Sequence, residues 1–528
     1  MTRESDAREG LARVGEAGAE RELKFAADRR TLRAALASPL LGGEMGPPAW
    51  RRLKSVYFDT ADGDLAEARV ALRMRRSAGG WTMGFKRAGQ SAFEREETEV
   101  KAGSALPDLS LFDAAVARRI EDLAGGEPLA PKFGADIRRA ARTIEAGGAT
   151  IEVAFDQGFL FAGERRENAA EIELELKSGP PEALFDLGLA LIEAFPARLC
   201  AASKAERAHA LIAGKPAEPV RADDAALPAD ASLDDAIAIL LRACLMHFLM
   251  NLAALDKGDR VEAVHQMRVA MRRLRSALGL FAATVPSAAL IALRAETKRI
   301  GAALGEARDW DVFVGRLRDG DLARFSGEPG FDRLLAAAGA KAAKSEAAVA
   351  RLAGDKTFDR FALRLERLAA ARGWREDVSQ EALAALDQPI EAFAAASLDR
   401  LRRKARKRGR GFRSLTPSEH HALRIAVKHV RYATEFFGAI FHTESAARRY
   451  ARAAARLQDR LGELNDAQIA LRLVKALGPV GKGRAAYAAG LVTGWCARAG
   501  EGDAAALRRL WRRFKRTAPF WPNDKGPA

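Results

Sequence analysis

Charged side chains recur at every second position in four segments of the first 180 residues. Successive side chains of a β-strand point to opposite faces, so each row of charges would occupy one face of its strand. In EIELELK, Ile172, Leu174 and Leu176 alternate with the charges and take the other face. The rows therefore mark either the solvent side of a sandwich or the lining of a barrel. They are Glu20, Glu22 and Lys24; Arg73 and Arg75; Arg95, Glu97 and Glu99; and Glu171, Glu173, Glu175 and Lys177.

The signs of these charges favour the barrel. A polar row on one strand is most often a solvated face, but four rows that mix acids and bases favour a charged interior. Carboxylates bind hard divalent cations, and proteins usually hold Mg²⁺ with a few carboxylates plus substrate phosphates. Lys and Arg neutralise phosphates directly. The pattern therefore predicts a tunnel that accepts a metal-bound polyphosphate.

The same residues resemble the CYTH domain of triphosphate tunnel metalloenzymes. The motifs occur in the family's order over about two hundred residues: ExExK at 20–24, YFDT at 57–60, LRMR at 72–75, TMGFK at 82–86, RxExE at 95–99, DQG at 156–158, EIELELK at 171–177 and SKAER at 203–207. The resemblance implies an eight-stranded antiparallel barrel whose interior takes a triphosphate. ExExK lies close to the start in typical members, so we expect residues 1–19 to be a disordered extension.

The length of 528 residues indicates more than one core. We expect a linker at 214–232, where three prolines interrupt the apolar pattern, and a capping box of Ser232 with Asp235 that opens the next helix. Residues 1–215 hold 32 Lys and Arg against 34 Asp and Glu, which leaves 54 against 36 for the remainder. The basic surplus therefore belongs to the second half. The predicted domains are 20–213 for the tunnel and 233–520 for a helical region.

The location follows from what the sequence does not show. We find no stretch of eighteen apolar residues and no secretory signal. Cys200, Cys244 and Cys496 lack metal-ligand spacing, which fits a reducing compartment. We expect a cytoplasmic protein without membrane contact, associated with polyphosphate granules.

The second half shows apolar residues at helical spacing and repeats itself. The LGEARD segment at 304–309 recurs as LGELND at 461–466. Asp309 and Asp466 are interpreted as helix N-caps, with orientation of a neighbouring Arg as the alternative. A second duplication precedes these segments by about forty residues: His265, Arg268, Arg272 and Arg275 match His421, Arg424, Lys428 and Arg431.

Each set of four falls in a stripe about 80° wide on its helix. An Arg-rich stripe is most often a solvated face, but these stripes lack an acidic partner and are duplicated, so we expect them to bind an anion. This region, roughly 233–520, resembles the CHAD domain. The resemblance implies two four-helix bundles with pseudo-twofold symmetry and a basic surface that binds inorganic polyphosphate. His265 and His421 are expected to contact phosphate or to form other hydrogen bonds rather than to bind metal.

Two further basic runs lie at 400–413 and 507–516. Either could bind nucleic acid, because neutralisation of phosphates is independent of sequence. The region contains no recognisable nucleic-acid-binding module. We therefore rank polyphosphate first and RNA second as the polyanion, and consider nucleic acid an unlikely partner.

Together these expectations describe an α+β multidomain protein with a candidate hydrolytic site. One or two Mg²⁺ or Mn²⁺ ions would be held by carboxylates: Glu20, Glu22, Glu97, Glu99, Glu173 and Glu175. Phosphate oxygens would be bound by six cations: Lys24, Arg73, Arg75, Lys86, Arg139 and Lys204. For Arg139, the neighbours Arg138 and Arg142 compete for the same role.

The predicted activity is hydrolysis of inorganic tripolyphosphate to pyrophosphate and phosphate. Long polyphosphate, thiamine triphosphate and ATP are alternative substrates. A class IV type adenylate cyclase and a non-catalytic polyphosphate-binding scaffold are the alternative functions. The oligomeric state is left open.

Overall fold

The computed structural model describes residues 19–89, 91–214, 217–222, 227–441, 443–477, 484–499 and 504–522. It divides into two compact units. The first comprises Met1–Pro219, Leu252–Asp259 and Lys356–Ala371, and the second Val220–Asn251, Arg260–Asp355 and Arg372–Ala528. The extension predicted at 1–19 lies outside the described residues except for its last member, and so does part of the linker predicted at 214–232.

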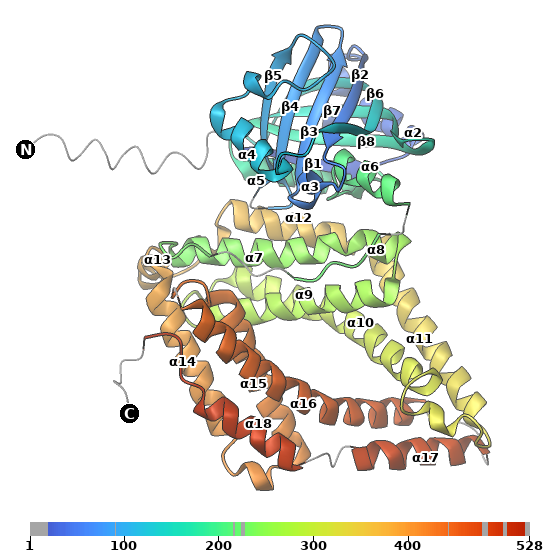
Figure 1. Ribbon diagram of the computed structural model, residues 1–528, viewed down its shortest axis with the longest axis vertical. Helices are drawn as coiled ribbons and strands as arrows, with labels where there is room; N and C mark the ends of the chain where they lie inside the picture. Colours follow the sequence, from blue (N-terminus) through green and yellow to red (C-terminus); the bar gives the residue numbers. More distant parts are fainter. Residues whose placement is uncertain are drawn as a thin grey trace, which may run out of the picture. The chain divides into compact units, whose positions relative to one another are not determined.

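The first unit is built around a closed antiparallel barrel (Figure 1). The strand order is β5-β4-β3-β2-β6-β7-β8-β1, and β1 also pairs with β5, which closes the ring of eight. This confirms the predicted barrel. A short ninth strand, β9 (Arg198–Leu199), adds to β1. The eight strands are β1 (Ala19–Ala26), β2 (Arg51–Asp59), β3 (Val70–Ser77), β4 (Gly80–Ala88), β5 (Glu94–Ala102), β6 (Ala130–Ala146), β7 (Ala149–Ala162) and β8 (Arg165–Ser178).

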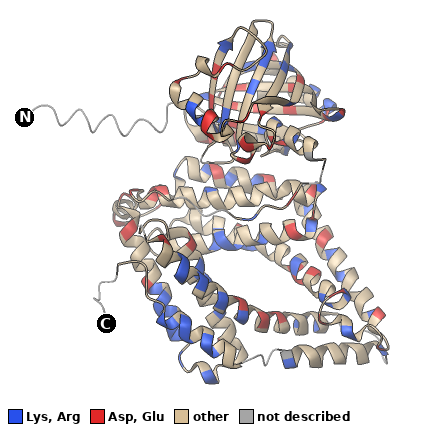
Figure 2. Cartoon of the chain, viewed as in Figure 1, with Lys and Arg blue, Asp and Glu red and all other residues tan. Residues whose placement is uncertain are grey.

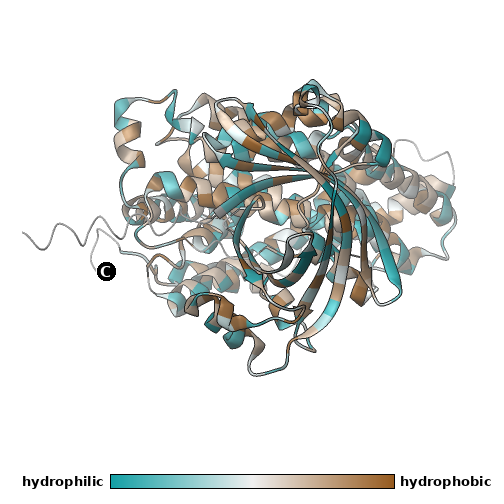
Figure 3. Ribbon diagram, turned by 90° about the horizontal axis from the view of Figure 1, so that it is seen from above, coloured by the Kyte–Doolittle hydropathy of each residue, from teal (hydrophilic) through white to brown (hydrophobic). Residues whose placement is uncertain are grey.

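The strand register brings the charged rows together. Lys86 pairs with Glu97 across β4 and β5, and Lys24 pairs with Glu173 across β1 and β8. Directly opposite residues share a face, so rows from neighbouring strands enter one interior. Hydrophilic and hydrophobic residues alternate along the barrel strands in Figure 3.

The alternate apolar positions of β1 and β8 form a core outside the barrel. Leu23 and Phe25 of β1 are 0% exposed, and helix α5 (Pro181–Ala194) packs against β1 and β8. At Gly188 of α5 an added Cβ would lie 2.7 Å from Leu23 Cδ1. Glycine therefore allows the close approach of this helix to β1. Hydrophobic residues thus pack on the outer face of these barrel strands, and the charged residues face the interior.

Six other α-helices belong to the part of the first unit that the structure describes. Asp59, in the YFDT motif, is buried and accepts backbone N–H groups of Thr60, Leu65 and Ala66. It thereby fixes the turn into a short helix and has a structural role. The helices are α2 (Arg29–Leu36), α3 (Asp64–Glu67), α4 (Ala114–Ala124), α6 (Lys204–Ala213), α8 (Leu252–Lys257) and α12 (Thr357–Ala370).

The described part of the second unit contains ten helices in two similar sets. Consecutive helices of each set pack together, and the sets contact one another through equivalent members, α9 with α15 and α10 with α16. This is the pseudo-twofold arrangement expected from the repeats. The first set is α7 (Leu233–Met250), α9 (Arg260–Phe281), α10 (Ala288–Arg318) and α11 (Phe331–Gly354). The second is α14 (Ile390–Arg408), α15 (Pro417–Phe437), α16 (Glu444–Ala476) and α17 (Arg484–Ala499), with α13 (Gln380–Leu386) before it and α18 (Ala504–Arg516) after it.

The capping box predicted at the start of α7 is half formed: Ser232 is the N-cap, and the Asp235 carboxylate bonds to the Ser232 hydroxyl rather than to its backbone N–H. Ser232 Oγ accepts the Asp235 N–H at 3.1 Å and lies 2.6 Å from Asp235 Oδ2. Leu233–Lys257 is long and apolar enough to cross a membrane by length and composition, which the sequence analysis did not expect. In that stretch 61% of the most apolar window is buried within the structure, and a helix packed inside a bundle passes the same test.

Candidate active site and basic helical face

The barrel encloses a cavity of about 640 Å³. Its lining comes from all eight strands and from α3 and α6. The structure places all twelve residues predicted for the hydrolytic site in this lining: Glu20, Glu22, Lys24, Arg73, Arg75, Lys86, Glu97, Glu99, Arg139, Glu173, Glu175 and Lys204. Their assignment to metal or to phosphate stays a prediction.

One group of charges comes from β1, β3, β4 and β5, which follow one another around the barrel in the order β1-β5-β4-β3. Lys86 Nζ is 3.3 Å from Glu20 Oε2 and also pairs with Glu97. Arg73 Nη2 lies 3.1 Å from Glu97 Oε1 and pairs with Glu99. Burial and a hydrogen bond to Glu97 raise the pKa of Glu20 to about 9, whereas the pKa of Glu97 is lowered because the Glu20 bond and Lys86 outweigh burial. Glu20 therefore holds a proton more tightly than Glu97 does.

Glu22 and Lys24 form an ion pair on β1. Burial opposes ionisation of Glu22, but Lys24 and Lys86 outweigh burial and lower its pKa. On the β3 wall, burial and the charge of Arg73 lower the pKa of Arg75 to about 10. Arg75 is still protonated at neutral pH, so it adds positive charge to the lumen.

A second group centres on Lys204, the first residue of α6. Its Nζ lies 2.7 Å from Asp156 Oδ2, 2.6 Å from Glu171 Oε2 and 2.6 Å from Glu173 Oε1. Arg139 donates two hydrogen bonds of 2.7 Å to Asp156 and also pairs with Glu173. Burial alone would lower the pKa of Lys204, but the three carboxylates raise it well above its usual value.

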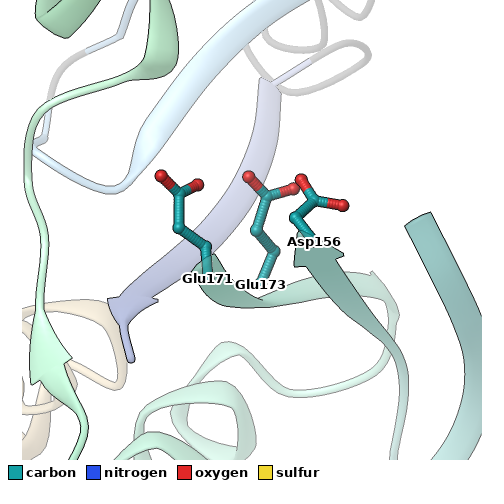
Figure 4. Close-up of side chains that lie close together, drawn as sticks. All are labelled: Asp156, Glu171 and Glu173. Carbon is teal, nitrogen blue, oxygen red and sulfur yellow. The ribbon is translucent and has the colours of Figure 1, made fainter. Parts of the chain in front are cut away.

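These three carboxylates have the chemistry of a metal site. Asp156 of β7 and Glu171 and Glu173 of β8 are buried, and ligand oxygens from them lie within 4.8 Å of one another (Figure 4). Carboxylate oxygens are the donors that Mg²⁺ prefers, so the residues fit a divalent cation. Lys204 Nζ contacts all three carboxylates, so its ammonium group supplies the counter-charge that a metal would also supply.

Sequence reasoning missed two members of this trio. Glu171 is the first residue of the charged row at 171–177, and Asp156 is the first residue of the DQG motif. The pattern of the sequence assigns neither residue to a metal site. The signal that joins them is the register, because Asp156 pairs with Glu171 across β7 and β8.

In the second unit, the two basic stripes lie on helices that pack together, α9 and α15. The pKa of Lys428 on α15 is lowered to about 8, first by burial and then by Arg272 and Arg275 of α9. Burial and the charges of Arg272 and Arg268 likewise lower the pKa of Arg424. Charges from both repeats are therefore close enough to repel, and they form one surface, which we call the basic face. Figure 2 shows Lys and Arg gathered along α15 and the neighbouring α14.

Several groups of the basic face are buried without a hydrogen-bond partner in the described part of the chain: Arg272 Nε, Arg424 Nε and His265 Nδ1. Buried polar atoms are usually hydrogen-bonded in folded proteins, and a bound anion would supply acceptors for the two arginine Nε–H groups. Other predicted residues already have partners. His421 Nδ1 lies 2.8 Å from Asn465 Oδ1, and Arg431 Nε donates to Glu435 at 2.7 Å.

The N-cap interpretation of Asp309 and Asp466 is wrong. Asp309 lies within α10 and Asp466 within α16, because each LGE segment continues a long helix instead of starting one. Asp309 instead accepts from Arg268 at 2.7 Å and from Arg472 at 2.8 Å. It orients a basic-face arginine, as the alternative interpretation proposed.

Comparison with known proteins identifies the two parts. Residues 18–209 match the CYTH domain family, and residues 239–475 match the CHAD domain family. The chain is a CYTH–CHAD protein. Both resemblances inferred from the motifs are thereby confirmed.

Individual relatives of this CYTH–CHAD protein cover parts of it. An inorganic triphosphatase from Haemophilus influenzae is 31% identical over 173 residues, 30% of this chain and 46% of that protein. The chain thus spans about half the length of this curated relative. The crystal structure of the CHAD domain from Ricinus communis is 31% identical and covers 57% of this chain and 97% of that one, with a TM-score of 0.49. A putative adenylyl cyclase from Hippeastrum, described as having a dominant triphosphatase activity, is 20% identical over 37% of this chain and 95% of that one, with a TM-score of 0.28.

Proposed function

We propose that the CYTH barrel is a metal-dependent inorganic triphosphatase, which hydrolyses tripolyphosphate to pyrophosphate and phosphate, and that the CHAD half binds inorganic polyphosphate. The observation that carries the proposal is the charge balance of the barrel cavity. Among the described residues, nine Asp and Glu and ten Lys and Arg line it. A surface that only bound a polyanion would need the bases alone, whereas a site for a metal–phosphate complex needs both signs. The likeness to the Haemophilus influenzae triphosphatase supports the same assignment.

The roles of the residues follow from their present partners. Lys24, Arg73 and Lys86 now pair with carboxylates of the first group, and Arg139 and Lys204 with the acidic trio. Phosphate oxygens of the substrate would replace the carboxylates as partners of these cations. The new ion pairs would orient the substrate and neutralise its charge. Phosphoryl transfer depends chiefly on such positioning and electrostatic stabilisation.

The carboxylates released by this exchange would hold the metal. Asp156, Glu171 and Glu173, with Glu20 and Glu22, are the donors that fit a hard cation. Bound Mg²⁺ or Mn²⁺ supplies Lewis acidity and lowers the pKa of a bound water. The protein's own contribution is to hold these acids beside fixed cations inside the barrel.

The test is release of phosphate from tripolyphosphate with Mg²⁺ or Mn²⁺, with a chelator as the metal-free arm. Lys24→Ala and Glu22→Ala should each abolish release. Lys101→Ala is the matched control, because Lys101 lies on β5 but is exposed and outside the cavity lining. Turnover retained in both cavity variants would contradict the proposal.

The same assay separates the alternative activities. Long polyphosphate, thiamine triphosphate and ATP are compared with tripolyphosphate as substrates. Cyclic AMP formed from ATP would identify an adenylate cyclase. Binding of long polyphosphate without release of phosphate from any substrate would identify a non-catalytic scaffold.

Polyphosphate binding by the CHAD half is tested on the basic face. The unpaired Arg272 and Arg424 nitrogens support an anion as the missing partner. Arg272→Gln with Lys428→Gln should weaken binding of long polyphosphate. Lys341→Gln with Lys344→Gln removes the same charge from exposed positions on α11 and should leave binding unchanged. Duplex RNA, measured in parallel, shows whether the surface prefers nucleic acid.

A further inference from the structure

Helix α12 lies between the two helical repeats in the sequence but belongs to the same compact unit as the barrel. It packs against α5. Leu363 of α12 is 0% exposed, and its Cδ2 lies 3.6 Å from the Cβ position of Gly188 on α5. The barrel unit is therefore completed by residues that follow its last strand by more than 150 positions.

Polar contacts fix α12 at both of its ends. Lys356, just before α12, donates to the carbonyl oxygens of Ile192 and, at 2.6 Å, Phe195. Ile192 belongs to the last turn of α5, where carbonyls lack partners within the helix. Lys356 has a φ of +58°, a strained conformation that persists when surrounding contacts enforce it. At the other end, Arg367 Nε lies 2.6 Å from Asp186 Oδ1.

Asp359 connects α12 to the short strand β9. Its side chain is 1% exposed, and its Oδ2 accepts from Arg198 Nε at 2.6 Å and from the Leu199 N–H at 3.4 Å. A buried carboxylate is stable only when charged or polar donors replace water. Because β9 has two residues and pairs with β1 only at Phe25 and Ala26, these bonds are a large part of what holds it.

The chain runs from β9 directly into the tunnel. The next residue, Cys200, donates its N–H to the Lys24 carbonyl at 2.8 Å. Ser203 then caps α6, whose first residue is Lys204. Two of the three lysines predicted to bind phosphate are thus in contact with the segment that Asp359 anchors: Lys204 follows it in the chain, and the backbone carbonyl of Lys24 accepts from it. Small displacements of positioning groups have large effects on catalysis.

We propose that Asp359 is a positioning residue of the tunnel: through β9 it sets the places of Lys24 and Lys204, so a helix from between the CHAD repeats is needed for tight binding of tripolyphosphate in the CYTH barrel. The inference rests on the proposed triphosphatase function, which it deepens by naming a determinant of substrate affinity outside the lumen.

The test uses the full chain and two variants of α12 contacts. Asp359→Asn keeps the size of the side chain and an acceptor for Leu199 but loses the charge that holds Arg198. We expect KM for tripolyphosphate to rise about tenfold, with a smaller change in kcat. Asp186→Asn breaks the ion pair of α5 with α12 and does not contact β9, so its KM should stay within about twofold of the parent. Arg198→Gln should reproduce the effect of Asp359→Asn, and the double variant should add little to either.

Binding without turnover gives a second measurement. Tripolyphosphate should raise the thermal unfolding midpoint of the parent and Asp186→Asn, and raise it less in Asp359→Asn and Arg198→Gln. Equal behaviour of all variants, or equal losses in Asp186→Asn and Asp359→Asn, would overturn the inference. If Asp359→Asn does not fold, the same measurements on Arg198→Gln test the inference, because the Arg198 side chain is 40% exposed and its loss should be tolerated. A parent that binds tripolyphosphate without releasing phosphate would contradict the triphosphatase and leave the positioning role to be decided by the midpoints.

Discussion

At the scale of single residues, the tunnel charges are satisfied by one another. Lys204 shows this most clearly, because one ammonium group contacts three buried carboxylates. The sequence predicted which rows would line the lumen, since alternation alone determines the face of a strand. It did not reveal that Asp156 belongs with Glu171 and Glu173, because that depends on the register of β7 against β8.

Replacement of Lys204 tests this arrangement. Lys204→Met removes the counter-charge from three buried acids, so the free energy of unfolding in a chelator should fall by about 3–5 kcal/mol. Mn²⁺ or Mg²⁺ should restore part of the loss, because the vacated carboxylates fit a divalent cation. Denaturant unfolding with and without metal measures both effects. Lys101→Met, at an exposed site, is the control, and a Lys204→Met protein as stable as the parent in chelator would contradict the prediction.

The pH dependence of polyphosphate binding depends on Lys428. Burial and the arginines of α9 lower its pKa to about 8. A bound polyanion would raise that pKa, so binding takes up a proton and affinity should fall as pH rises through about 8, by at most about tenfold per pH unit. Calorimetric titration with long polyphosphate across about pH 6.5 to 9.5 measures this. Lys428→Arg stays protonated and should flatten the profile; an unchanged slope would exclude Lys428 as its source.

At the scale of elements, α10 ties the two repeats together. Asp309 of α10 binds Arg268 of α9 and Arg472 of α16. Sequence reasoning predicted the repeats and their helices from periodicity. It misplaced Asp309 and Asp466 because a Gly followed by an Asp is typical of a helix boundary, and only the structure shows that α10 and α16 continue through the LGE segments.

Asp309→Asn tests that tie. It weakens two charge-assisted hydrogen bonds and should lower the free energy of unfolding of the helical region by about 1–3 kcal/mol. Polyphosphate affinity should be retained or increase, since Arg268 loses a competing anion. Unfolding by circular dichroism and binding by calorimetry measure the two outcomes. A loss of affinity without a loss of stability would show that Asp309 acts on the ligand directly.

At the scale of the whole molecule, the change in charge between the two halves indicated a domain boundary, and the motifs identified both families. The docking of α12 in the barrel unit could not be predicted, because it depends on Asp359 and Lys356 meeting groups that lie more than 150 positions earlier. No periodic pattern records such a pairing. The expectation that no stretch could cross a membrane overlooked Leu233–Lys257, which is long and apolar enough. How much of such a stretch is buried depends on its packing, which the sequence does not show.

The two proposed activities should be separable. Arg272→Gln with Lys428→Gln should reduce binding of long polyphosphate and the dependence of that binding on salt, while KM for tripolyphosphate stays within about twofold, because the barrel cavity is lined by other residues. Parallel titrations at two salt concentrations and steady-state kinetics check this. A matched fall in tripolyphosphate turnover would show that the basic face also serves the tunnel.

The near balance of acids and bases around the tunnel has a consequence for how ligands bind there. A divalent ion that binds alone would take carboxylates away from lysines and arginines and leave these cations without a partner. A triphosphate that binds alone would leave carboxylates without a partner. When both arrive, every displaced group finds a new partner. Each ligand should therefore increase the affinity of the other by the same factor, so that the barrel binds metal and triphosphate together more tightly than either one by itself.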